Sequence, residues 1–214
     1  ADNRIVGAEA LLRWQHPERG LISPVHFLPL AEDNGLIIPI SEWVLREACR
    51  QAMNWQRSGL PIISVSVNFW SEKLKKTDLI NMVAQALAES GLEPNCLELE
   101  LTESFILFDG IEKLHQLNAM GLQLSIDDFG TGYFSFNDLN RLPVHKVKID
   151  KSFVSKLAND IDTKPIIETI IQLAHKFKLI TLAEGVETDI QHNFLRSHGC
   201  DQIQGYFVAR PMPA

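Results

Sequence analysis

The chain has 214 residues, of which 45% are hydrophobic and 22% are charged, and its formal net charge is −7. This composition is ordinary for a well-buried globular protein, and the length fits either one large α/β domain or two small ones. The negative charge argues against a basic surface for duplex nucleic acid, and no apolar run approaches the length of a membrane span. We therefore expect no duplex nucleic acid partner and no membrane contact by this domain itself.

Short apolar runs alternate with helical patterns along the chain. In chain order, we expect a strand at Ile5–Leu12, helices at Pro24–Asn34 and Ser41–Ser58, a strand at Ile62–Asn68, a helix at Asp78–Ser90, a strand at Cys96–Thr102, a helix at Ile111–Met120, strands at Leu122–Asp128 and Lys146–Asp150, a helix at Thr163–Phe177, a strand at Leu179–Glu184, a helix at Thr188–Ser197 and a strand at Gln202–Gln204. Ser41 is placed as a helix N-cap, and four glycines stand where helices end: Gly59, Gly91, Gly121 and Gly199. Such alternation implies parallel strands joined by crossover helices. Seven strands are one short of a closed eight-stranded barrel.

Three cysteines, Cys49, Cys96 and Cys200, lie far apart and form no CxxC pair. Widely spaced cysteines in an odd number favour free thiols in a reducing compartment, so we expect a cytoplasmic location. A longer protein that contains this domain could still be anchored to a membrane through other parts.

Several predicted strands alternate between apolar and polar side chains. In "LELELT", for example, the leucines alternate with Glu98, Glu100 and Thr102, which predicts one face against helices and one face inside a barrel. The last inward residue of successive strands is repeatedly of a ligand type: Asn68, Glu100, Asp127, Lys148 and Glu184. Glu9 and Arg13 are in phase on the first strand. An open sheet also tolerates single acids at strand ends, but unpaired acids that converge on one concave site repel strongly, so we favour a catalytic site of the TIM-barrel kind.

The candidate ligands carry only oxygen donors: Glu9, Asn68, Glu100, Asp127, Asp128 and Glu184. Hard oxygen donors favour Mg²⁺ or Mn²⁺, with Ca²⁺ as an inert mimic, and six of them exceed what one ion needs. We therefore expect two ions, with Asp127 bridging them and Asp128 turning to the second, a site suited to phosphodiester hydrolysis. Lys148 and Arg13 would balance the phosphate charge. Alternatively, Lys148 is a salt-bridge partner of Asp150 or of the acids, and Arg13 lies on the solvated rim.

Seven segments together resemble the EAL-domain cyclic di-GMP phosphodiesterases over essentially the whole chain. They are "GAEALLRW" from Gly7, "VNFW" from Val67, "ELTES" from Glu100, "DDFGTGY" from Asp127, "KIDKSFV" from Lys148, "AEGVET" from Ala183 and "QGYFVARP" from Gln204. The resemblance implies an α/β fold, a TIM-like (β/α)8 barrel of the EAL type. It also implies a metal-dependent phosphodiesterase that hydrolyses cyclic di-GMP to linear pGpG in bacterial signalling, with Mg²⁺ or Mn²⁺ active and Ca²⁺ inhibitory.

The resemblance also implies roles for individual residues. Glu9, Asn68, Glu100 and Asp127 resemble ligands of the first metal, and Asp127, Asp128 and Glu184 resemble ligands of the second. Lys148 resembles the lysine that orients water, Arg13 the arginine that contacts phosphate, and Leu12 and Gln204 residues of the substrate pocket. Glu103 resembles the acid that stabilises the loop after the aspartate pair, and Asp150 and Glu187 are further candidates for contacts with the substrate.

Two departures from the family pattern add aromatic bulk. Phe134 and Phe136 stand where the family commonly has serine and leucine, and Trp70 stands where it commonly has serine. These changes bear on the loop and on a homodimer through the loop and helix after Asp128. They keep open a second function, in which a weakly active or inactive domain acts as a cyclic di-GMP receptor or partner-binding module. Another metal-dependent barrel hydrolase is a third possibility.

The predicted domain organisation is a single EAL domain over residues 1–214. The family has a strand before the position of Arg4 that is missing here, so we expect an N-terminally incomplete domain from a longer signalling protein with N-terminal regulatory domains.

Overall fold

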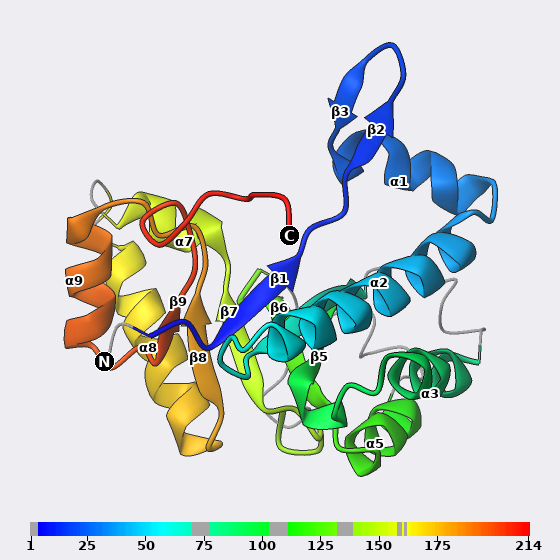
Figure 1. Ribbon diagram of the computed structural model, residues 1–214. Coiled ribbons are helices and arrows are strands. Elements are labelled where there is room, and N and C mark those ends of the chain that lie inside the picture. The colour runs from blue at the N-terminus through cyan, green and yellow to red at the C-terminus, as the bar shows by residue number, and fades with distance from the viewer. Residues whose placement is uncertain (1–3, 70–77, 103–110, 132–138, 158–159, 161) are drawn as a thin grey trace. The chain divides into compact units, whose positions relative to one another are not determined.

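The computed structural model describes residues 4–69, 78–102, 111–131, 139–157, 160 and 162–214 (Figure 1). The chain divides into two compact units, which are described separately. Unit 1 is formed mainly by Leu124–Ala214 and unit 2 mainly by Ile5–Glu100. Within the described part of the chain, no helix combines the length and apolar character needed to cross a membrane.

In unit 2, the strands β1 (Gly7–Ala10), β4 (Ser64–Phe69) and β5 (Leu97–Thr102) follow one another in sheet order. β1 runs parallel to β4, with Glu9 opposite Ser66. Val65, Val67 and Leu99 of the apolar set are buried, and so are Ser66, Glu98 and Glu100 of the polar set. The helical layer contains α2 (Ile37–Arg57), α3 (Leu79–Ser90) and α5 (Ile111–Ala119), and a short 3₁₀ turn, η2 (Pro94–Cys96), leads into β5.

A small antiparallel ribbon follows β1 that the sequence pattern does not predict. It consists of β2 (Trp14–His16) and β3 (Gly20–Ile22), and α1 (Pro24–Asp33) comes directly after it (Figure 1). The Trp14 ring packs edge-on against Phe27 of α1, with the ring centroids 5.8 Å apart. Strands of three residues are too short for a period-two pattern to reveal.

In unit 1, the strands β6 (Gln123–Phe129), β7 (Lys146–Ile149), β8 (Ile180–Ala183) and β9 (Gln202–Ile203) lie in chain order, each parallel to the next. The connections carry α7 (Lys151–Lys156), α8 (Thr163–Lys176) and α9 (Asp189–Ser197). Figure 1 shows α8 and α9 next to each other beside β8 and β9. Neighbouring parallel strands in chain order, joined by helices, are how a TIM-type barrel is wound. All seven predicted strands are present.

Some expected boundaries are wrong. The first strand ends at Ala10 instead of Leu12, and Ser41 is not an N-cap. α2 already begins at Ile37, since Pro39 falls in its first turn, where proline is tolerated. The Ser41 hydroxyl is buried and donates a hydrogen bond to the carbonyl oxygen of Ile37 at 2.8 Å.

The expected helix ends are confirmed by backbone geometry. A positive φ, between 76° and 93°, occurs at each of the four predicted glycines: Gly59, Gly91, Gly121 and Gly199. This left-handed conformation ends a helix with little strain only where no Cβ is present.

Candidate metal centre

Three carboxylates gather at one place in unit 1. Oxygens of Asp127, Asp128 and Glu184 all lie within 4.8 Å of one another. We expected the strand to end at the aspartate pair. It instead continues to Phe129, with a register shift between Ile126 and Phe129. Asp128 has a φ of 52° within that shift. Neighbouring residues of a regular strand point to opposite faces, so this irregularity is what lets both aspartates approach Glu184.

Lys148 brings a positive charge into the same cluster. Its Nζ lies 3.0 Å from Asp127 Oδ1 and 2.6 Å from Glu184 Oε1, and only 1% of its side chain is exposed. A buried ammonium group is costly unless it is paired, and two carboxylates supply that pairing here. The alternative reading of Lys148, as a salt-bridge partner of the acids, is therefore confirmed, and it is compatible with a catalytic role.

The environment of Asp128 shifts its ionisation. Burial, together with the negative charge of Asp127, raises the pKa of Asp128 to about 6. Asp128 also shares a hydrogen bond with Asp150. Burial alone would raise the pKa of Asp150, but hydrogen bonds from Ser152 and Asp128 lower it below its usual value. Asp150 also caps α7 by accepting a hydrogen bond from the Ser152 N–H at 3.0 Å.

Unit 2 holds the other predicted ligands. Asn68 Nδ2 donates to Glu9 Oε1 at 2.6 Å, across the paired strands β1 and β4. Glu100 lies on β5, with 2% of the residue exposed. The structure therefore brings Glu9 and Asn68 together.

We expected Arg13 to lie on the first strand with Glu9. It lies beyond that strand, because β1 ends at Ala10. Its side chain is exposed, and Nη1 donates to the carbonyl oxygen of Leu12 at 2.7 Å. The described geometry therefore fits the rim position that the sequence left open, while Leu12 is half-buried.

Gln204 and Glu187 lie near β8 in unit 1. The Gln204 N–H donates to the carbonyl oxygen of Ala183 at 2.8 Å, so Gln204 is next to the residue that precedes Glu184. Glu187 is exposed just before α9, and its N–H donates to Gln191 Oε1 at 2.8 Å. Four other residues singled out in the sequence lie outside the described residues: Trp70, Glu103, Phe134 and Phe136.

The donor chemistry of the unit 1 cluster fits a hard divalent cation. Asp127, Asp128 and Glu184 offer carboxylate oxygens only, which suit Mg²⁺ and Mn²⁺ better than softer metals. The contact between Asp128 and Asp150 was not predicted. The only sequence signal near this contact is a possible helix cap at Asp150. α7 has six residues, which are too few for a helical periodicity to be recognised.

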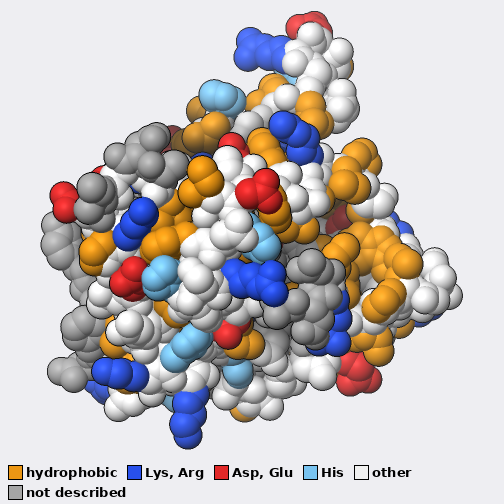
Figure 2. Space-filling view, turned by 90° about the vertical axis from the view of Figure 1, so that its left-hand side faces the viewer, with side chains coloured by type: hydrophobic (Ala, Val, Ile, Leu, Met, Phe, Trp, Pro, Cys, Tyr) orange, Lys and Arg blue, Asp and Glu red, His pale blue; other side chains and the backbone are white. Residues whose placement is uncertain are grey.

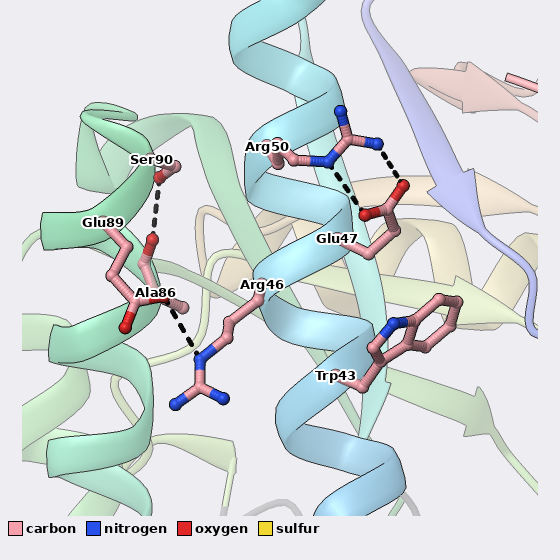
Figure 3. A pocket seen from close by; sticks show the side chains of 7 residues that line it. All are labelled: Trp43, Arg46, Glu47, Arg50, Ala86, Glu89 and Ser90. Atoms are coloured by element: carbon pink, nitrogen blue, oxygen red, sulfur yellow. Dashed lines mark hydrogen bonds and ion pairs between the residues drawn. The ribbon is translucent and has the colours of Figure 1, made fainter.

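A groove between α2 and α3 in unit 2, of about 240 Å³, contains none of the predicted site residues (Figure 3). Its two arginines already have acidic partners: Arg46 Nε lies 3.3 Å from Glu89 Oε2, and Arg50 Nε donates to Glu47 Oε2 at 2.9 Å. Because these charges are balanced, we assign no ligand to the groove.

Comparison with known proteins supports the same reading. Residues 1–211 match the model of the EAL domain family. The chain is 47% identical over 213 residues to the bifunctional diguanylate cyclase/cyclic di-GMP phosphodiesterase MucR of Pseudomonas aeruginosa, and 41% identical over 216 residues to the cyclic di-GMP phosphodiesterase NbdA of the same species. These matches cover 98% and 100% of the chain, but it spans only 31% and 28% of those relatives.

A solved structure extends the likeness to the fold. The MucR phosphodiesterase in complex with c-di-GMP superposes with a TM-score of 0.93 at 47% identity, covering 96% of this chain and 85% of the other. The expected fold class, a TIM-like barrel of this family's type, is confirmed by that match.

Proposed function

Because this chain belongs to the EAL domain family, we propose that it is a metal-dependent phosphodiesterase that hydrolyses cyclic di-GMP to linear pGpG. The observation that carries the proposal is the buried Lys148 ammonium group between Asp127 and Glu184, with Asp128 in the same cluster. A structural ion pair needs one acid, whereas three acids around one lysine leave an excess of negative charge that suits a bound cation.

The proposed ligands follow the family's pattern along the chain. Asp127, Asp128 and Glu184 would hold one ion, and Glu9, Asn68 and Glu100 would complete, with Asp127, the ligand set of a second ion. When bound, Mg²⁺ or Mn²⁺ would lower the pKa of a water molecule and neutralise charge on the phosphodiester, and Ca²⁺ would bind without supporting turnover. Support comes from the oxygen-only donor set and from the family match.

The chain's own residues would orient the reactants. Lys148 Nζ, held by Asp127 and Glu184, would donate a hydrogen bond to the attacking water and keep that water in line with the phosphorus. Arg13 would contact the phosphate, and Leu12 and Gln204 would line the pocket for the substrate. Asp150 would keep Asp128 in place, and Glu187 and Glu103 complete the proposed set.

A turnover assay tests the proposal. The protein is incubated with cyclic di-GMP and either Mg²⁺ or Mn²⁺, and the nucleotides are separated by chromatography. We expect pGpG to accumulate with either ion and to be suppressed by Ca²⁺. Absence of pGpG with both ions, from folded protein, contradicts the proposal. Binding of cyclic di-GMP without turnover would instead favour the receptor function, which Phe134 and Phe136 motivate.

The wider assembly is also a proposal. Since the chain spans about a third of its relatives, we propose that it works within a longer signalling protein that has regulatory domains. From the family resemblance we also propose a homodimer. A cytoplasmic location is supported by the three free cysteines, Cys49, Cys96 and Cys200.

A further inference from the structure

Glu184 begins a turn that includes Val186. Backbone hydrogen bonds connect Val186 to Gln204 and Phe207, near the C-terminus. The Glu184 N–H donates to the carbonyl oxygen of Ile149 at 3.0 Å, which fixes the residue beside β7. Two residues further on, the Val186 N–H donates to the Gln204 carbonyl at 3.0 Å, and the Phe207 N–H donates to the Val186 carbonyl at 2.9 Å. We call these last two hydrogen bonds the Val186 bridge.

Gly205 lies between the two hydrogen bonds of the Val186 bridge. A Cβ atom on Gly205 would lie 2.2 Å from the Val186 carbonyl oxygen and 2.4 Å from the Val186 nitrogen. These neighbours are backbone atoms, which cannot rotate away as a side chain can. The φ of Gly205 is 149°, a conformation that residues with a Cβ rarely adopt. Glycine is therefore required for this close approach of the two segments.

We propose that Gly205 is a positioning residue for Glu184. By allowing the Val186 bridge to form, it holds the Glu184–Val186 turn so that the Glu184 carboxylate meets Lys148 and the aspartate pair. The inference rests on the proposed function, since it concerns how one acid is presented to a cation. A glycine required only for stability would affect folding without changing the affinity of the folded protein for metal.

The first test compares Gly205→Ala with Gly199→Ala. Gly199 is a matched control, because its φ is also positive, at 81°, but a Cβ there would come no closer than 3.8 Å to His175. Calorimetric titration with Mn²⁺ is expected to show affinity weakened about tenfold in Gly205→Ala and changed less than about twofold in Gly199→Ala. Gly205→Ala protein that is folded but binds Mn²⁺ as tightly as Gly199→Ala overturns the inference.

The second test uses the unaltered protein and decides the question even if Gly205→Ala does not fold. Coupling between two sites is reciprocal, so metal bound at Glu184 must strengthen the Val186 bridge if the bridge positions Glu184. With Mg²⁺, hydrogen exchange in peptides containing Val186 and Phe207 is expected to slow several-fold more than in a peptide containing Leu179, whose N–H donates to the Ala174 carbonyl. Equal slowing in both regions overturns the inference.

The outcomes separate this inference from the proposed function. If the unaltered protein releases no pGpG but Gly205→Ala still weakens Mn²⁺ binding, the function fails and the inference stands. If the unaltered protein is active and Gly205→Ala matches Gly199→Ala in Mn²⁺ binding, the inference fails and the function stands.

Discussion

Lys148 is buried, with 1% of its side chain exposed, and Asp127 and Glu184 lie within hydrogen-bonding distance of its Nζ. One ammonium group can neutralise only one of these two carboxylates. Without the ammonium group, the two carboxylates would repel each other strongly. The chemistry of the site thus depends on the balance between one ammonium group and the carboxylates around it.

Substitutions at the site should distinguish residues that bind metal from a residue that affects only the turnover rate. We expect Lys148→Ala to reduce turnover by about 10²–10⁴-fold while still binding Mn²⁺, because water orientation is lost and the carboxylates remain. Asp127→Ala and Glu9→Ala should abolish turnover by losing metal. Initial rates and Mn²⁺ calorimetry measure both effects, and Lys156→Ala, at an exposed lysine, is the control. Wild-type activity of Asp127→Ala would show that its bridging role is wrong.

Asp128 should make the stability of the metal-free protein depend on pH. Its pKa is raised to about 6 from an ordinary value near 3.8, so between about pH 4 and pH 6 the folded state holds a proton that the unfolded chain has released. Stability should therefore fall as pH rises through this window. Asp128→Asn removes the titration, and asparagine tolerates a φ of 52°. In thermal unfolding with EDTA, the melting temperature of Asp128→Asn should fall less between about pH 4 and pH 6 than that of the unaltered protein. Parallel falls in the two melting temperatures would contradict this prediction.

At the level of helices and strands, Asp201 links β8 and α8 in unit 1. Asp201 Oδ2 accepts hydrogen bonds from the N–H and the hydroxyl of Thr181 on β8, both at 2.8 Å, and lies 2.9 Å from Nε2 of His175 on α8. Similarly, Nε2 of His198, the residue that follows α9, lies 3.0 Å from Oε1 of Glu168 on α8. Figure 2 shows histidine side chains at the surface of the face that carries α9. Polar contacts thus reinforce the apolar packing of these helices on the sheet.

Removal of the Asp201 carboxylate should loosen this junction. Burial opposes ionisation, but hydrogen bonds from Thr181 and His175 lower the pKa of Asp201 below its usual value. Its contribution is therefore present above about pH 4 and is lost as pH falls below that value. We expect Asp201→Ala to lower the free energy of unfolding by about 1–3 kcal/mol at pH 7, and by less at pH 3.5, in urea denaturation. Asp162→Ala, which removes no capping hydrogen bond, is the control. Equal effects of the two variants would contradict the role of Asp201.

For the molecule as a whole, the proposed homodimer gives a prediction about Phe134 and Phe136. We expect sedimentation at about 10 μM to show a dimer, as is common for homo-oligomers. The double variant Phe134→Ser, Phe136→Leu restores the family's pattern and should change the dimer fraction while leaving Mn²⁺ affinity unaltered. A monomer for both proteins at that concentration would contradict the prediction.

Much of the fold could be predicted because its signals are local. The buried Leu97, Leu99 and Leu101 follow a period of two, and the glycines that end the helices mark their own positions. The β2–β3 ribbon and α7 could not be predicted, since strands of three residues and a helix of six residues are too short for a periodic pattern to be recognised. The start of α2 was wrong because a proline in a first turn resembles a helix boundary.

The sequence by itself determined the positions of the seven strands along the chain, the acidic residue types and the family, because residue chemistry and periodicity are properties of the chain alone. Only the tertiary structure decided that Asp127 and Asp128 both approach Glu184, that Lys148 is shared between two acids, and that Gly205 meets the backbone of Val186. The physical reason is that these contacts join separate strands and turns. Their distances depend on strand register, on one irregular φ angle and on the approach of two backbones, none of which a local pattern encodes.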